Sequence, residues 1–245
     1  MKIWFFHLFF VYLSGKLKAM NENIFVKYLS KKILKEKTKN FEPGPVITIS
    51  RQFGCYATAI AAKLNKKISE KSLHPWDYIT KEIIEDSAKK LDLEEQDIAH
   101  IFGADEIGFL GDLIVSFSNK KYKSDAVIKK TIHSVVRRYA EQGNCIIVGR
   151  AGCIIASDIE KSLHVRLVAP LEYRINANKT KYNISYKEAR ELVSETDQKR
   201  IQFMKFFKGD KPDEDIFDLM LNREKLSDDE IVETIFRLAE FRNLV

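Results

Sequence analysis

The sequence is poor in cysteine, with three such residues among 245. Three cysteines cannot build the disulfide framework of a small secreted domain. The sequence also has neither a Cys-x-x-Cys pair nor two histidines at the spacing of zinc ligands, which argues against a structural zinc site. These absences exclude disulfide-rich and zinc-finger scaffolds.

Glycine and proline are scarce as well, with ten and five residues, too few for a collagen-like or low-complexity chain. The content of aromatic residues is high instead, with sixteen Phe and nine Tyr, and 45% of the residues are hydrophobic. Such a composition argues against intrinsic disorder. A chain of 245 residues suits one large domain or two small ones.

Negative charge is in the minority, because 35 Asp and Glu face 41 Lys and Arg. The formal net charge is +6 and the isoelectric point is about 9.0. A modest positive field of this kind fits an anionic partner. It does not distinguish between a nucleotide, a nucleic acid and a membrane surface.

The apolar run at residues 3–13 is too short for a membrane-spanning helix, which needs ~20 residues. It has the size of a signal-peptide core, but residues 16–39 are rich in lysine and the cleavage pattern is poor. Another interpretation takes Met20 as the true start of the protein, so that residues 1–19 come from an over-long gene prediction. A related interpretation is that residues 1–19 form a disordered tail. We favour these interpretations over a signal peptide or a membrane-surface anchor. We therefore expect residues 20–245 to form one domain, located in the cytoplasm.

Short apolar runs alternate with amphipathic stretches along the chain. The apolar runs predict buried strands, and the amphipathic stretches have apolar residues at helical spacing. This alternation predicts an α/β fold with a mostly parallel sheet. Strands are expected at residues 46–49, 76–79, 145–148, 163–168 and 216–221.

The helices have recognisable ends in several places. Thr80 is a candidate N-cap for the helix after the second strand, and Ser227-Asp-Asp-Glu230 is a capping box for the last helix. Residues 97–121 are expected to form short helices and loops. Further helices are expected at residues 23–37, 57–68, 125–142 and 171–208.

Ligands of parallel α/β sheets bind at the carboxyl ends of the strands. The loop after the first strand, Ser50-Arg-Gln-Phe-Gly-Cys-Tyr-Ala-Thr58, has one Gly and no Lys, unlike the pattern G-x-x-x-x-G-K-[ST]. A loop at this place often binds phosphate through backbone amides and the helix N-terminus. From the loop alone, a phosphate-binding loop and a plain strand-to-helix turn both stay open.

Several segments taken together resemble the cytidylate kinase-like family, a branch of the P-loop nucleoside monophosphate kinases. The first is Ile47-Thr-Ile-Ser-Arg-Gln-Phe-Gly54, with Ile60-Ala-Ala-Lys-Leu64 after it. Ile146-Ile-Val-Gly-Arg150 resembles the Gly-Arg strand end of that family, and His164–Arg174 resembles its next strand and the start of the following helix. Thr196-Asp-Gln-Lys-Arg200 resembles its mobile lid, where an Asp-x-x-Arg pattern recurs.

The resemblance implies a three-layer P-loop NTPase-type fold, with a parallel sheet of about five strands flanked by helices. It also implies a helical acceptor region at about residues 80–142 and a lid at about residues 179–212. The implied reaction is transfer of the γ-phosphoryl group of ATP to a nucleoside monophosphate, CMP or dCMP, with Mg²⁺.

The resemblance also implies site residues. Phosphoryl transfer depends on positioning and charge neutralisation, and the planar fork of arginine suits phosphate oxygens. Arg150, Arg174 and Arg200 are therefore the candidate catalytic residues, and Asp77 is a candidate on the acceptor side. Cys55 is expected to be exposed at a helix N-terminus, which would lower the pKa of its thiol. The candidate phosphate-binding residues are Ser50, Arg51, Gly54, Cys55, Tyr56, Ala57 and Thr58.

The chain departs from the kinase pattern at three positions. By register with Gly54, the loop lysine falls at about Ala57 and the magnesium-binding hydroxyl at about Ala59. Ala151 stands where cytidylate kinases have an Asp after the Gly-Arg pair. These departures favour one alternative, a nucleotide-binding protein with weak or no catalysis. The isoelectric point of about 9.0 and the lysine-rich N-terminal helix favour another, a basic nucleic-acid-binding protein. We expect no resident metal site and no stable nucleic-acid partner.

Overall fold

The computed structural model describes most of the chain from residue 43 onward. The predicted helix at residues 23–37 and the predicted short helices at residues 97–121 lie outside the described part, as do residues 1–19. Among the helices that are described, none is long and apolar enough to cross a membrane. The described ranges are 43–91, 125–209 and 211–245.

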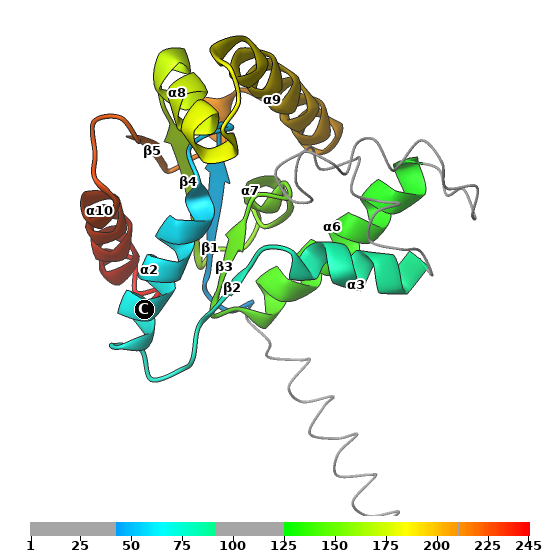
Figure 1. The fold of residues 1–245 in the computed structure, drawn as a ribbon. Coiled ribbons are helices and arrows are strands. Elements are labelled where there is room, and N and C mark those ends of the chain that lie inside the picture. The colour runs from blue at the N-terminus through cyan, green and yellow to red at the C-terminus, as the bar shows by residue number, and fades with distance from the viewer. Residues whose placement is uncertain (1–42, 92–124, 210) are drawn as a thin grey trace, which may run out of the picture. The chain divides into compact units, whose positions relative to one another are not determined.

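The centre of the fold is a five-stranded sheet with the strand order β2-β3-β1-β4-β5 (Figure 1). Every neighbouring pair of strands is parallel. This confirms the predicted parallel α/β fold. The strands are β1 (Val46–Arg51), β2 (Asp77–Ile79), β3 (Cys145–Val148), β4 (Ser162–Val168) and β5 (Leu219–Asn222).

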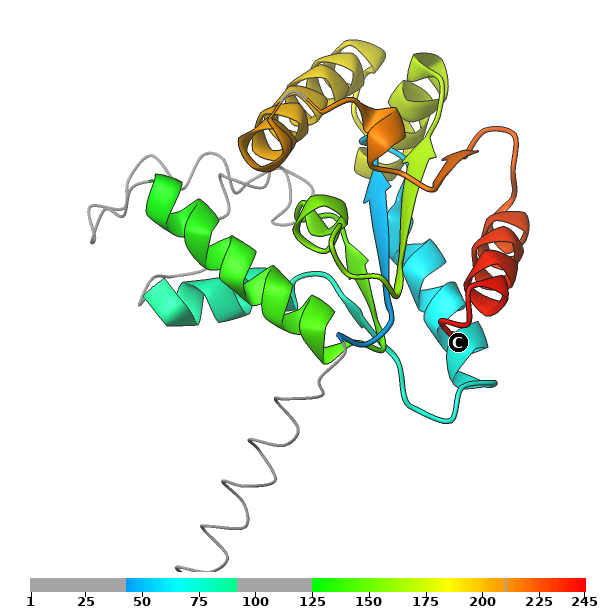
Figure 2. The ribbon, with the colours of Figure 1, turned by 180° about the vertical axis from the view of Figure 1, so that it is seen from behind.

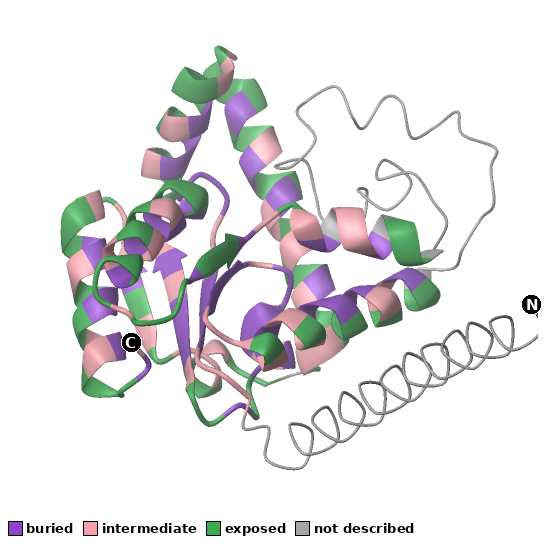
Figure 3. Ribbon diagram, turned by 90° about the horizontal axis from the view of Figure 1, so that it is seen from below, coloured by how far each residue is buried: buried purple, intermediate pink, exposed green. Residues whose placement is uncertain are grey.

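Helices cover both faces of the sheet, which gives three layers (Figures 1 and 2). One apolar cluster joins α2 and α10 to alternate residues of β1, β3 and β4, and a second cluster joins α3, α6 and α7 to the opposite face. Buried residues occupy the three central strands β3, β1 and β4 and the inner helix faces (Figure 3). The helices are α2 (Ala57–Ser69), α3 (Glu82–Leu91), α6 (Asp125–Gln142), α7 (Gly152–Ile155), α8 (Leu171–Tyr182), α9 (Tyr186–Lys208) and α10 (Asp228–Phe241).

Several predicted boundaries are wrong. Strand β1 continues through Ser50 and Arg51, because these residues pair with Arg166 and Leu167 of β4. The helix after β2 begins at Glu82 without Thr80 as its N-cap; the Glu82 carboxylate accepts hydrogen bonds from the Thr80 amide and hydroxyl instead.

The last strand starts later than predicted. Residues 216 and 217 donate their backbone N–H groups to the Asp213 carbonyl, as part of the turn that follows the 3₁₀-helix Asp213–Asp215. Strand β5 therefore begins only at Leu219. The long helical region is divided into α8 and α9 at Asn183, which is left-handed, and a capping box of Ser185 and Glu188 starts α9.

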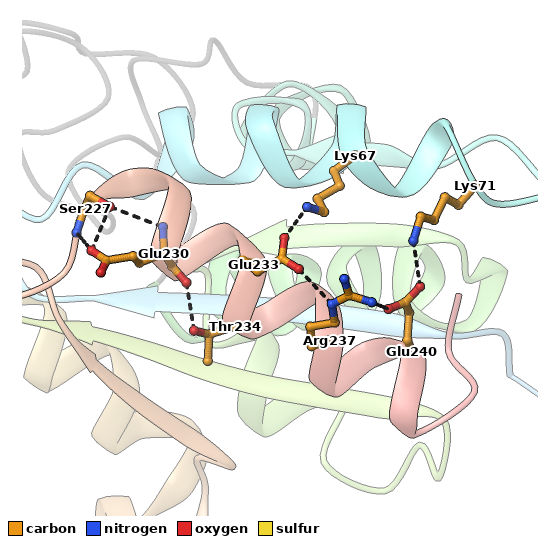
Figure 4. A network of polar contacts seen from close by, with 8 residues as sticks. All are labelled: Lys67, Lys71, Ser227, Glu230, Glu233, Thr234, Arg237 and Glu240. Carbon is orange, nitrogen blue, oxygen red and sulfur yellow. Dashed lines mark hydrogen bonds and ion pairs between the residues drawn. The ribbon is translucent and has the colours of Figure 1, made fainter.

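Helix α10 lies against α2 with a buried apolar face and a row of ion pairs beside it. The predicted capping box is present, because Ser227 and Glu230 each accept the other's backbone N–H. Lys67 pairs with Glu233, and the Lys71 ammonium lies 3.1 Å from the Glu240 carboxylate (Figure 4). The apolar face consists of Ile231, Val232, Ile235, Phe236 and Ala239.

Candidate functional site

A cavity of about 360 Å³ lies at the carboxyl ends of the strands. The end of β1 and the turn after β3 form its floor, and α9 forms a wall, in agreement with the rule for ligand sites in open α/β sheets. Helices α8 and α9 lie beyond these strand ends (Figure 1). The lining residues are Ser50, Arg51, Gln52, Gly149, Arg150, Ala151, Arg166, Asp197, Arg200, Ile201, Phe203, Met204, Lys208 and Asp213.

Three predicted arginines come together in this cavity. Arg51 ends β1, Arg150 follows β3, and Arg200 comes from α9. Burial lowers the pKa of Arg51 to about 10. Burial, and next the positive charge of Arg51, lower the pKa of both Arg150 and Arg200. Because like charges lie close together in a buried place, a bound anion would stabilise their charged forms.

The turn after β3 has an unusual backbone. Gly149, Arg150 and Ala151 all have positive φ, at 75°, 55° and 54°. This conformation is uncommon for residues with a Cβ and costs conformational energy. The turn places the Arg150 side chain, which is only 6% exposed, on the cavity wall. A Cβ atom on Gly149 would collide with the Arg51 guanidinium, so glycine leaves room for the end of the Arg51 side chain.

A second polar group on the cavity wall was not predicted. Arg166 of β4 pairs with Asp213, and the Lys208 ammonium lies 2.9 Å from the same carboxylate. The sequence feature that indicates this group is Arg166 itself, a cation that interrupts the apolar run of β4. This group carries one more positive than negative charge, so it adds to the positive character of the cavity.

The loop between β1 and α2 is packed against α8. Gly54 has φ of 91°, and a Cβ atom there would lie 2.8 Å from Asn178 Nδ2 and 3.0 Å from the Arg174 carbonyl oxygen. Glycine is therefore required both for the backbone conformation and for the contact with α8. This contact gives Gly54 a structural role, and its predicted contact with phosphate stays a prediction.

Arg174 lies behind the loop, where it joins three segments. Its Nε donates to the Ala169 carbonyl at 3.1 Å, and its Nη1 donates to the Phe53 carbonyl at 3.4 Å and pairs with Asp197. Asp197 in turn accepts the Phe53 backbone N–H at 2.8 Å. The ion pair therefore holds the Phe53 backbone at both its N–H and its carbonyl.

Asp197 is a functional candidate that was not among the predicted site residues. Its signal was the Asp-x-x-Arg spacing, which puts Asp197 and Arg200 on one face of a helix. Arg200 Nη1 donates to the Arg51 carbonyl at 3.4 Å. Two successive turns of α9 thus contact the backbone around the end of β1.

The start of α2 differs from the prediction for Cys55. The Cys55 side chain is 0% exposed and lies in the apolar core, so burial raises the pKa of its thiol to about 11. The expected exposed thiol with a lowered pKa is wrong, because the side chain points inward beneath the loop.

Tyr56 precedes α2 in a left-handed conformation, and its hydroxyl donates to Asn178 Oδ1 at 3.0 Å. Ala57 is buried and Thr58 is exposed in the first turn.

Asp77 is not brought to this site. It is the first residue of β2 and pairs in register with Cys145, the first residue of β3. It therefore lies at the amino edge of the parallel sheet, opposite the edge that carries the cavity. Of the predicted residues, those on the cavity wall are Ser50, Arg51, Arg150 and Arg200.

The acidic groups of the site do not form a metal site. In the described ranges, no three His, Cys, Asp or Glu side chains come together in a way that could hold a metal ion. Asp197 and Asp213 both line the cavity, but each is engaged by cationic side chains. The residues described therefore do not fit a resident Mg²⁺.

Comparisons with known proteins identify the family of the chain. The cytidylate kinase-like family matches residues 46–225. A cytidylate kinase from Ignicoccus hospitalis is 32% identical over 121 residues, which cover 49% of this chain and 70% of the relative.

Solved structures of similar fold exist as well. An uncharacterized protein from Eubacterium ventriosum has a TM-score of 0.58 at 17% identity, covering 80% of this chain and 98% of its own. A shikimate kinase from Bacteroides thetaiotaomicron has a TM-score of 0.48 at 12% identity, covering 80% of this chain and 97% of its own.

The parallel sheet, the glycine loop and the cationic cavity at the strand ends define a kinase-type α/β protein. The chain belongs to the cytidylate kinase-like family. Family and fold together support a transferase that binds nucleotides.

Proposed function

We propose that the protein transfers the γ-phosphoryl group of ATP to a nucleoside monophosphate, with CMP or dCMP as the preferred acceptor. The observation that carries the proposal is the convergence of Arg51, Arg150 and Arg200 in one cavity at the carboxyl ends of the strands. The cytosine preference is supported by the cytidylate kinase relative and by the family.

In this proposal the acceptor phosphate binds in the cavity against the three arginines. Guanidinium groups bind phosphate oxygens in pairs and stay charged, so they hold the acceptor and neutralise the charge that develops during transfer. An oxygen of the acceptor phosphate attacks the γ-phosphorus of ATP, and the bond to the bridging oxygen of ADP breaks. The products are ADP and a nucleoside diphosphate.

The donor is proposed to bind at the loop from Gly54 to Thr58 and the N-terminus of α2. Backbone N–H groups and the helix dipole favour negative charge at such a place. The family implies a divalent metal together with ATP. Because Mg²⁺ commonly binds through substrate phosphates and water with few protein ligands, it would enter with the nucleotide.

A coupled assay of ADP release with CMP, dCMP, UMP and AMP tests the proposal. We expect turnover with at least one acceptor, fastest with CMP or dCMP. Arg150→Met should lower kcat/KM by about 10²- to 10³-fold, the usual loss for one electrostatic group of a transition state. Arg190→Met is the matched control, because Arg190 is exposed on α9. Absence of turnover with every acceptor would refute the enzyme assignment.

A second candidate is a nucleotide-binding protein with weak or no catalysis. The observation that favours it is the pair Ala57 and Ala59, which stand at the positions of the loop lysine and the metal-binding hydroxyl. This candidate predicts that ATP raises the melting temperature while no acceptor is phosphorylated. The cytoplasmic location and the lack of a stable nucleic-acid partner stay predictions.

A further inference from the structure

The proposed donor site has a deficit of positive charge on its own loop. The position of the loop lysine is taken by Ala57, whose methyl group is buried in the core. In P-loop proteins that lysine reaches the β- and γ-phosphates. A donor site that binds ATP here therefore needs a cation from another element.

One face of α8 lies over the loop and the start of α2. Arg174, Asn178 and Lys181 are spaced by four and three residues, which places them on the same face of a helix. Arg174 contacts Phe53, and Asn178 accepts the Tyr56 hydroxyl. Lys181, the third residue of this face, continues the contact toward α2.

Lys181 is held directly beside the residue that precedes α2. Its ammonium lies 4.1 Å from the centre of the Tyr56 ring and 5.1 Å from the centre of the Tyr182 ring. Tyr56 is itself fixed by its hydrogen bond to Asn178. Cation–π attraction to two aromatic rings therefore holds the ammonium beside the side chain of the residue that precedes α2.

We propose that Lys181 supplies, from α8, the phosphate-binding ammonium that the loop lacks. The inference rests on the proposed function, because it assigns a residue to the donor half of that site. The lysine side chain has a flexible four-carbon stem, so its ammonium can turn from the Tyr56 ring to a phosphate that binds at the α2 N-terminus.

The electrostatic setting of Lys181 agrees with this role. Lys181 is exposed, and partial desolvation beside the aromatic rings lowers its pKa. Since a bound triphosphate would bring negative charge beside the ammonium, it would stabilise the protonated lysine. A cation–π contact that only fixes Tyr56 would not depend on the nucleotide, and this difference separates the two roles.

Isothermal titration calorimetry with ATP, ADP and CMP on Lys181→Ala and Lys181→Arg tests the inference. Lys179→Ala is the matched control, because Lys179 is an exposed lysine two residues away, on the other side of the same helix. We expect Lys181→Ala to weaken ATP and ADP binding at least about 10-fold, as loss of a charge-assisted hydrogen bond predicts. CMP binding and the melting temperature without nucleotide should not change. Lys181→Arg should restore part of the ATP affinity.

Equal ATP affinity of Lys181→Ala and Lys179→Ala would overturn the inference and leave the proposed function intact. Equal losses for ATP and CMP, with a lowered melting temperature, would also overturn it, because they indicate a structural role. If the unmodified protein takes up no ATP, the proposed function and this inference fail together.

Discussion

At the scale of single residues, the backbone of Phe53 is where the loop after β1 is bound to the two helices beside it. Its N–H donates to the Asp197 carboxylate, its carbonyl accepts from Arg174, and these two side chains pair with each other. The loop is thereby tied to both α8 and α9. Arg174, a predicted catalytic residue, holds the loop in position in this structure.

Asp197→Ala should destabilise the fold, because it removes the acceptor of the Phe53 N–H and leaves the buried Arg174 without this carboxylate. The expected loss of unfolding free energy is about 2 kcal/mol, the cost of leaving buried polar groups unsatisfied. Urea unfolding followed by circular dichroism measures it. Glu195→Ala is the control, since Glu195 is exposed on the same helix. Equal stability of the two variants would contradict the role of the ion pair.

His164 makes the stability dependent on pH. It is buried between Thr48, whose hydroxyl oxygen lies 2.8 Å from Nδ1, and Ser162. Burial lowers its pKa from 6.5; the carboxylate of Asp218 opposes this and Arg242 adds to it. Below pH 6.5 the unfolded chain therefore binds more protons than the folded one, and the folded state loses stability as the pH falls.

Unfolding free energies measured by urea titration at pH 7.5 and 5.5 test this dependence. We expect the value at pH 5.5 to be lower. His164→Gln cannot titrate, so the difference between the two pH values should shrink in that variant. A pH dependence that is the same in both proteins would assign the effect to other groups.

At the scale of elements, α10 shows which forces join a helix to the sheet. The ion pairs with α2 lie along the surface, where water screens them. The apolar face of α10 is fully buried against α2 and the sheet. Burial of the apolar face should therefore dominate the docking.

Ile235→Ala should lower the unfolding free energy by about 3 kcal/mol, because it leaves a cavity in the core. Glu233→Gln, two residues earlier, removes the partner of Lys67 and should leave the urea midpoint almost unchanged. Chemical denaturation of both variants in the same buffer makes the comparison. A larger loss of unfolding free energy for Glu233→Gln than for Ile235→Ala would show that the ion pairs, and not apolar burial, dominate the docking.

Elements with a strong local pattern could be predicted from the sequence, while elements shaped by distant contacts could not. Helix α6 and strand β3 have the predicted bounds, because their apolar periodicity lies within the segment itself. The sequence predicts a loop at the end of β1, because the strand that pairs with it, β4, lies more than a hundred residues away.

The candidate site shows the same division. The convergence of Arg51, Arg150 and Arg200 follows from the resemblance and from the rule that strand ends meet at one edge. The burial of Cys55 and the contact of Asp197 with the Phe53 backbone depend on tertiary packing, which a local pattern does not contain.

At the scale of the whole molecule, the two halves of the proposed site come from distant parts of the chain. The loop near residue 54 lies against α8, and α9 forms a wall of the cavity. Because Asp197 and Arg200 of α9 both contact the backbone around the end of β1, a movement of α9 would alter the loop and the cavity together. The lid at about residues 179–212 stays a prediction, and this coupling is the route by which it would act on the proposed site.

The most direct test of the account is calorimetric titration of the unmodified protein with ATP. The account predicts saturable uptake of one ATP per chain, with an affinity that falls as salt is raised, because charged groups make the contacts. If the folded protein takes up no nucleoside triphosphate at any salt concentration, the loop and the arginines do not form a nucleotide site, and the account is contradicted.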